Sequence, residues 1–308
     1  MSQVSIPDPI LLQVEKPSRY IGGEVNSVMK DPSNTPVRIA FCFPDVYEIG
    51  MSHLGLQLLY GDFNQMPNVY CERAFAPWPD MEQKLRENHI PLYTLETFTP
   101  IREMDFVAFT LQYEMSFTNI LNMLDLAGIP LYAADRGDND PLIIAGGPTA
   151  SNPEVLAPFI DFFYIGEGEV SYHEIFNRYE AHKAAGGHRR DFLSKILDLG
   201  PIYVPAYYDV EYYDTPAAGA QYTSAIRSIH PNRADAPAKI RKDIVTDLET
   251  SYYPLKPIVP YLQTVHDRAV MEIFRGCIHG CRFCQAGQVY KPVRYRSKET
   301  VMAMCEEL

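Results

Sequence analysis

Long hydrophobic runs and a signal peptide are missing from this sequence of 308 residues. No stretch approaches the roughly 18 uncharged apolar residues that a helix needs to cross a bilayer. Residues 1–7 also lack the basic and apolar regions with which secreted proteins begin. These absences favour a cytoplasmic protein that makes no use of a membrane.

Positive charge and cysteine are also scarce. The formal net charge of -12 opposes attraction to phosphate backbones and anionic membrane surfaces, so nucleic acid is not indicated as a partner. The six cysteines are too few for a disulfide scaffold, and three of them lie between residues 277 and 284. This crowding favours a metal site.

The sequence does contain enough apolar material for well-packed cores. Hydrophobic residues make up 46% of the chain and aromatic residues 12%, as is typical of a soluble globular protein. Because domains most often have about 100–150 residues, a chain of this length holds one large core or two ordinary ones.

From residue 37 onward, short apolar runs of strand length alternate with helical stretches. This alternation predicts a parallel sheet covered on both faces, in a flavodoxin-like doubly wound α/β domain at residues 36–185. The expected strands are 37–43, 69–74, 106–111, 142–145 and 162–165, and the expected helices are 54–64, 81–88, 117–127 and 170–185.

Three further parts surround this domain. Residues 1–35, which are rich in proline and polar side chains, are expected to be a packing arm, and residues 186–267 a connector. A last unit at residues 268–308 begins with a strand at Ala269. In the connector, the candidates for a small hairpin are residues 202–204 and 210–213, and residues 214–222 are expected to form a loop.

Glycines gather at the carboxyl ends of the expected strands, at Gly50, Gly146, Gly147, Gly166 and Gly168. In a doubly wound sheet ligands bind at that edge, and glycine lets a ligand approach the backbone closely. A ligand crevice is therefore one interpretation. The other is that these glycines only make tight turns between strands and helices.

Cys277, Cys281 and Cys284 have the spacing C-x3-C-x2-C in a loop that follows an apolar run. Three thiolates on one short loop can hold an iron–sulfur cubane and leave its fourth iron open for an outside ligand. A zinc site usually needs a second, distant pair of cysteines, which the sequence lacks. The spacing therefore predicts a cluster with an open iron.

This loop resembles the signature of the radical S-adenosylmethionine (SAM) superfamily, C-x3-C-x-aromatic-C, with Phe283 at the aromatic position. The resemblance implies that the three cysteines ligate a [4Fe-4S] cluster, that SAM binds the open iron and that Phe283 lies beside the adenine. It also implies an external electron donor of flavodoxin or ferredoxin type and reductive cleavage of SAM to a 5'-deoxyadenosyl radical. The resemblance does not reveal the substrate.

The flanks of the loop carry the resemblance further. Arg275-Gly276 and residues 294–297 resemble radical SAM proteins with an N-terminal cobalamin-binding-like domain, and residues 145–148 and 165–169 resemble the fourth- and fifth-strand loops of that domain. The likeness covers residues 37–185 and 268–308. It implies a possible cobalamin-like crevice lined by the glycines named above together with Asp45 and Tyr47.

One departure concerns the cobalamin signature D-x-H-x-x-G. It aligns with Asp45, Tyr47 and Gly50, so a tyrosine stands where the cobalt-binding histidine is expected. A neutral phenol with a pKa of about 10 is a poor ligand for cobalt, which makes cobalamin doubtful. His53 is nearby but is expected at a helix start, where a capping role is the simpler interpretation.

Residues 268–308 supply only one of the roughly six strand–helix units of a radical SAM barrel, so this chain alone is expected to be an inactive fragment. Two alternatives stay open. A methylthiotransferase-like enzyme that modifies RNA or protein would need three more cysteines for an auxiliary cluster, whereas Cys42 and Cys71 are only two. A non-catalytic, metal-stabilised binding protein would hold zinc instead.

Overall fold

A six-stranded sheet forms the centre of the computed structural model, which describes residues 2–213 and 225–308. The strand order is β2-β1-β3-β4-β5-β6, and all neighbouring strands are parallel except β5 and β6. This order confirms the predicted doubly wound α/β sheet. The strands are β1 (Val37–Phe43), β2 (Val69–Phe75), β3 (Phe106–Thr110), β4 (Leu142–Gly146), β5 (Phe162–Tyr164) and β6 (Ile202–Tyr203).

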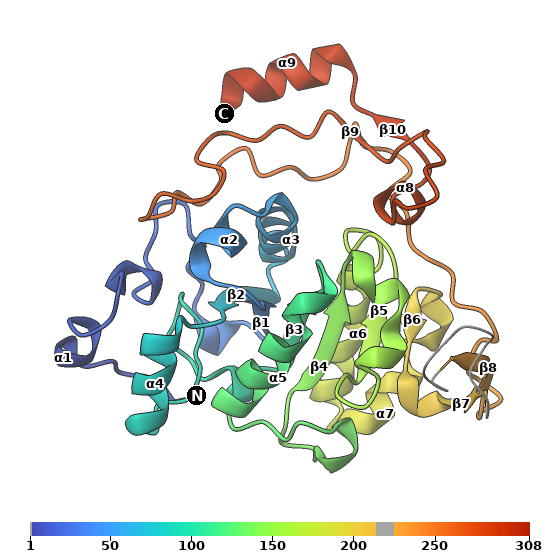
Figure 1. Cartoon of the computed structure of the whole chain (residues 1–308), viewed down its shortest axis with the longest axis horizontal. Helices are drawn as coiled ribbons and strands as arrows, with labels where there is room; N and C mark the ends of the chain where they lie inside the picture. Colours follow the sequence, from blue (N-terminus) through green and yellow to red (C-terminus); the bar gives the residue numbers. More distant parts are fainter. Residues whose placement is uncertain (1, 214–224) are drawn as a thin grey trace.

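Helices cover both faces of the sheet (Figure 1), as right-handed crossovers between parallel strands require. One pair is α3 (Leu54–Gln65) and α6 (Tyr172–Ala184), where Phe63 contacts aromatic rings of α6. The other pair is α4 (Pro79–Glu87) and α5 (Phe117–Leu126). The short helices of this part are α1 (Asp8–Leu11), α2 (Tyr47–Met51) and α7 (Arg189–Ser194).

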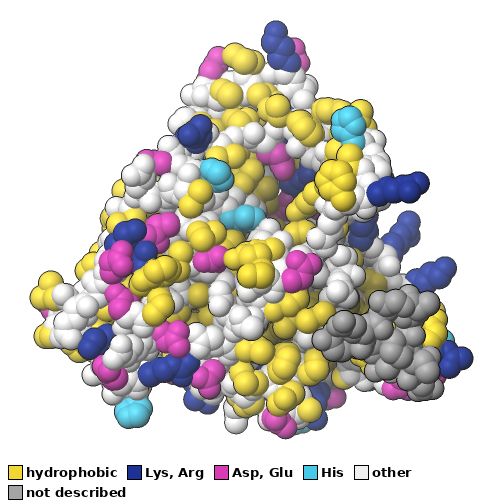
Figure 2. All heavy atoms as spheres, in the orientation of Figure 1, with side chains coloured by type: hydrophobic (Ala, Val, Ile, Leu, Met, Phe, Trp, Pro, Cys, Tyr) yellow, Lys and Arg dark blue, Asp and Glu magenta, His cyan; other side chains and the backbone are white. Residues whose placement is uncertain are grey.

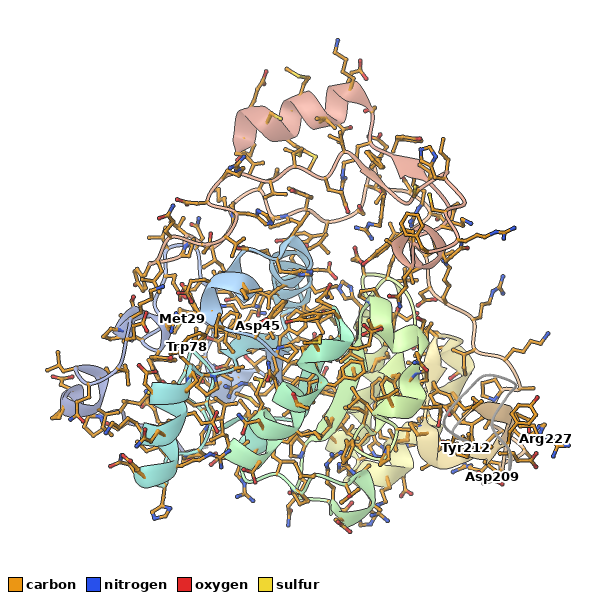
Figure 3. The ribbon with its side chains drawn as sticks, viewed as in Figure 1. Met29, Asp45, Trp78, Asp209, Tyr212 and Arg227 are labelled. Atoms are coloured by element: carbon orange, nitrogen blue, oxygen red, sulfur yellow. The ribbon has the colours of Figure 1, made fainter. Side chains whose placement is uncertain are left out.

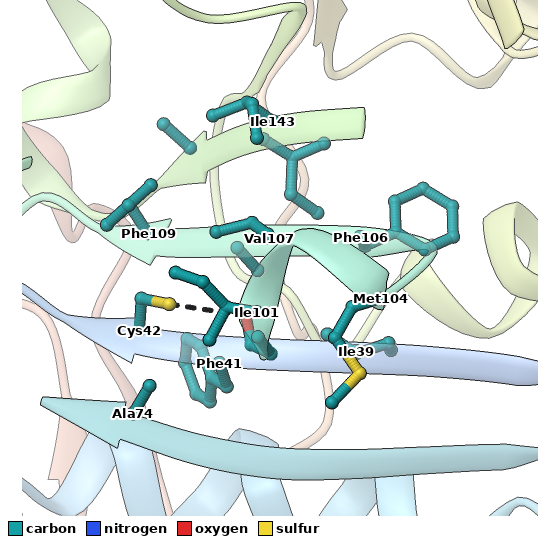
Figure 4. Packing of buried hydrophobic residues seen from close by; sticks show 14 of the residues in the cluster. Ile39, Phe41, Cys42, Ala74, Ile101, Met104, Phe106, Val107, Phe109 and Ile143 are labelled. Carbon is teal, nitrogen blue, oxygen red and sulfur yellow. Dashed lines mark hydrogen bonds between the residues drawn. The ribbon is translucent and has the colours of Figure 1, made fainter. Parts of the chain in front are cut away.

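The core lies between the sheet and these helices. All seven residues of β1 are buried because both faces are covered, and six of them are apolar; the exception, Arg38, is paired with the buried Glu72. Figure 4 shows Phe41 and Val107 in this packing. Cys42 and Cys71 are fully buried there, and burial raises the pKa of both thiols. Both are therefore core side chains that stay protonated.

The N-terminal arm packs on the edge strand β2. Glu24 is 3% exposed and accepts hydrogen bonds from Arg73 at 3.0 and 2.7 Å, while Arg73 Nε donates to Glu96 at 2.7 Å. Met29 and Trp78, labelled in Figure 3, lie on this side of the molecule. The arm thus covers a sheet edge whose charged side chains would otherwise face solvent.

The connector differs from the prediction. Residues 202–204 do not pair with residues 210–213, because β6 joins the free edge of β5 and extends the main sheet. The second strand, β7 (Tyr208–Tyr212), pairs instead with β8 (Ile226–Pro231) in a separate antiparallel ladder. The predicted hairpin is therefore wrong, and the loop predicted at residues 214–222 lies outside the described residues.

The C-terminal segment, residues 268–308, arches over the carboxyl ends of the parallel strands (Figure 1). The strand predicted from Ala269 contains only Phe274–Arg275 (β9), which pairs antiparallel with Arg294–Tyr295 (β10). Within the part of the chain that the structure describes, β9 has no parallel neighbour that would lengthen it. Two helices follow the cysteine loop, α8 (Ala286–Val289) and α9 (Lys298–Glu307). Among the described helices, none has the length and apolarity to cross a bilayer.

Candidate functional site

A cleft of about 880 Å³ separates the carboxyl edge of the sheet from the C-terminal segment. Figure 2 shows the hollow between the upper and lower parts of the molecule. Aromatic side chains, including Phe41, Phe109 and Tyr164, contribute to the sheet side, and Phe283 and Cys284 of the cysteine loop contribute to the opposite wall. The fold therefore brings the loop to the edge at which doubly wound sheets bind ligands.

Only some of the residues proposed for the crevice line this cleft. The glycines at and after the carboxyl ends of β4 and β5 do so, namely Gly146, Gly147, Gly166 and Gly168. Tyr47 is instead the buried first residue of α2, where its hydroxyl donates to Glu24 at 2.9 Å and burial raises its pKa. Asp45, labelled in Figure 3, accepts a hydrogen bond from the Tyr113 hydroxyl at 3.1 Å. Neither side chain contributes to the cleft wall.

Packing within the chain explains several of these glycines. A Cβ at Gly147 would lie 2.8 Å from the Leu111 carbonyl oxygen, and one at Gly168 would lie 3.1 Å from the Tyr172 ring. A Cβ at Gly50 would overlap the Phe75 ring. At these positions, other atoms of the protein occupy the space where a side chain would lie, so packing favours glycine there.

Of the described residues at or near the cobalamin signature, neither Tyr47 nor His53 is suited to bind cobalt. Tyr47 is engaged with Glu24, and His53 Nδ1 accepts a hydrogen bond from the Leu56 N–H at 3.1 Å. With Nδ1 as the acceptor, the neutral imidazole carries its proton on Nε2, so binding a metal through Nε2 would require the other tautomer and the loss of this hydrogen bond. His53 caps α3, and these residues do not fit cobalamin bound through a protein ligand.

The cysteine loop carries the donor chemistry of an iron–sulfur site. Cys277, Cys281 and Cys284 are free of disulfides, and the Cys284 N–H donates to the Cys281 carbonyl at 3.2 Å to make a tight turn. Gly276 has φ +101°, and a Cβ there would lie 2.7 Å from the Tyr290 carbonyl oxygen. Across residues 2–213 and 225–308, no three cysteine, histidine or carboxylate side chains are placed around one metal ion. The thiol set fits a three-cysteine cubane in chemistry, but the side chains do not converge.

Phe283 is the most exposed large hydrophobic side chain in the described part of the chain, at 92%. It lies next to Cys284 and lines the cleft. An apolar ring left almost fully in water contributes nothing to the core, so a contact with a ligand is the simpler explanation of its position.

A charged cluster that the sequence did not identify joins the two parts of the site. Arg275 forms ion pairs with Glu167 at 3.0 Å, Glu169 at 2.9 Å and Glu272 at 3.0 Å. Arg294 pairs with the same Glu167 at 2.7 Å. Burial raises the pKa of Glu169 despite the opposing effect of Arg275. Two sequence features could have indicated this cluster: the acidic motif at residues 166–169 and the arginines beside the cysteine loop.

Comparison with known proteins indicates the class. Residues 55–205 match the family model described as radical SAM proteins, N-terminal. This match supports membership of the radical SAM superfamily, and the matched residues lie outside the cysteine loop that suggested the same class. An uncharacterized protein of Methanocaldococcus jannaschii is 23% identical over 274 residues, which is 87% of this chain and 45% of that protein. The chain thus spans less than half the length of this relative.

Proposed function

We propose that this chain is the part of a radical SAM enzyme that holds the cluster and one wall of the substrate cleft. Cys277, Cys281 and Cys284 would ligate a [4Fe-4S] cluster, and Phe283 would contact the adenine of SAM. When bound and reduced by an external donor of flavodoxin or ferredoxin type, such a cluster supplies the electron that cleaves SAM to methionine and a 5'-deoxyadenosyl radical.

The observation that carries the proposal is that one cleft is lined by both the cysteine loop and the carboxyl edge of the sheet. A substrate held over the sheet would face SAM held at the loop. The cleft volume of about 880 Å³ is within the range of sites for small molecules. Its aromatic floor would exclude water from a reactive intermediate, and its charged wall would orient polar groups of the substrate.

The buried positions of Cys42 and Cys71 oppose the methylthiotransferase alternative. Both thiols are fully buried in the sheet core, so neither can contribute to an auxiliary cluster at the surface of the first domain. The described part of the first domain therefore lacks the exposed cysteines that this alternative needs for an auxiliary cluster.

Anaerobic reconstitution with iron and sulfide tests the proposal. We expect about four irons per chain and an electron paramagnetic resonance signal of the reduced cluster that changes when SAM is added. One tightly bound zinc and no cluster would instead support a metal-stabilised binding protein.

A further inference from the structure

Two arginines face each other across the short ladder that supports the cysteine loop. The register of β9 and β10 places Arg275 directly opposite Arg294. Like charges at directly opposed positions destabilise a strand pair. Because the two side chains are only 11% and 7% exposed, solvent screens their repulsion poorly. The ladder therefore needs an anion beside it.

Glu167 supplies that anion from the other part of the molecule. Its Oε2 accepts hydrogen bonds from Nη1 of Arg275 at 3.0 Å and from Nη1 of Arg294 at 2.7 Å. The same oxygen accepts from the backbone N–H of Val245 at 2.8 Å. Glu167 belongs to the loop after β5, so one carboxylate joins the sheet domain, the connector and both strands of the ladder.

We propose that Glu167 is a positioning residue for the cysteine loop: it neutralises the Arg275–Arg294 pair and so holds the loop at the cleft. The first cysteine, Cys277, is two residues beyond Arg275, so opening of the ladder moves the loop directly. This inference rests on the proposed function in one respect, because the loop is taken to carry the cluster. The bridging geometry itself is independent of any cofactor.

Glu169 provides a matched control on the same loop. Its side chain is as buried as that of Glu167, 11% against 12% exposed, and it pairs with Arg275 at 2.9 Å. It makes no ion pair with Arg294 among the described contacts. Replacing Glu169 removes one ion pair but leaves the two arginines bridged, so its effect isolates the contribution of bridging.

The test is amide hydrogen exchange at residues 274–284 in the 308-residue chain. We expect Glu167→Gln to speed exchange by about ten-fold or more, and Glu169→Gln or Glu167→Asp to change it much less. On an Arg294→Gln background, Glu167→Gln should add little, since one of the two facing charges is gone. Equal effects of Glu167→Gln on both backgrounds, or equal effects of the Glu167 and Glu169 variants, would overturn the inference.

A second measurement separates this inference from the proposed function. In reconstituted protein, Glu167→Gln should keep its iron but lose most of the SAM-dependent change in the paramagnetic signal, and Glu167→Asp should restore it. An unchanged SAM response in Glu167→Gln contradicts the positioning role. If the unsubstituted chain assembles no cluster, the proposed function fails, while the exchange experiment still decides whether Glu167 holds the loop.

Discussion

Gly166 lies against the backbone of Asp243, so closely that a Cβ at Gly166 would stand 2.5 Å from the Asp243 nitrogen and nearer still to its carbonyl oxygen. The two residues form a parallel bridge, and the Asp243 N–H donates to the Ile165 carbonyl at 3.0 Å. The end of β5 is thereby tied to the connector, at the base of the loop that carries Glu167.

Gly166→Ala should destabilise the protein by more than about 3 kcal/mol, because it adds a backbone clash to a φ of +121°. Gly186→Ala is the control: that residue also has a positive φ, +70°, but nothing lies within 4 Å of its Cβ position. It should cost about 1 kcal/mol. Urea unfolding measures both, and equal costs would show that the contact with Asp243 is unimportant.

The contact between Glu24 and Arg73 predicts how much the N-terminal arm stabilises the domain. Glu24→Gln leaves the fully buried Arg73 with only one of its two carboxylate partners, which should cost about 3 kcal/mol. Glu87→Gln removes a pair with Lys84 at the protein surface and should leave the free energy of unfolding almost unchanged, because solvent screens that pair. Similar unfolding free energies for the two variants would mean that the arm is not part of the folded unit.

The sheet was predictable because it follows from local pattern. Central parallel strands buried on both faces have nearly continuous apolar sequences, as at residues 37–43 where only Arg38 is charged, and the alternation of strands with helices indicates that they pair in parallel. The cysteine loop was equally visible, since its donors are close together in sequence. The pairing partner of β7 could not be predicted. Residue pattern alone does not decide which of two strands pairs with a given free strand edge.

The charged cluster was hidden for another reason. Glu167 and Arg275 are 108 residues apart, and an ion pair over that separation leaves no periodic signal. The glycines of the cleft show a related limit. The sequence located them at the strand ends, but only the structure shows that Leu111, Tyr172 and Asp243 occupy the space beside them.

Acid should release the contact between the arm and α2. Burial tends to raise the pKa of Glu48, but hydrogen bonds from Arg19 and Lys16 outweigh it and lower the pKa to about 2. Because the folded pKa is below the ordinary value of 4.5, this stabilisation is complete above pH 4.5 and is lost as the pH falls towards 2.

The measurement is the free energy of unfolding of the unsubstituted chain and of Glu48→Gln between pH 6 and pH 3. The gap between the two proteins should narrow as the pH falls, since protonation and the substitution remove the same charge. A gap that stays constant over this range would contradict the assignment.

Phe283→Ala should weaken SAM binding by about ten-fold, the usual effect of removing an aromatic ring that stacks on a base. The free energy of unfolding of this variant should equal that of the unsubstituted chain, because the Phe283 ring is 92% exposed. Ile278→Ala, on the same loop and 79% exposed but outside the cleft lining, should leave both properties unchanged. Titration of the reconstituted protein with SAM distinguishes the two variants. Equal affinities of the two variants for SAM would show that Phe283 does not contact SAM.

Iron binding by single cysteine variants tests the three-thiolate site most directly. Cys277→Ala, Cys281→Ala and Cys284→Ala should each lose most of the roughly four irons per chain and the SAM-dependent paramagnetic change, whereas Cys305→Ala, an exposed cysteine on α9, should keep both. A cluster that survives any one of the first three substitutions with its SAM response intact would contradict the proposed site.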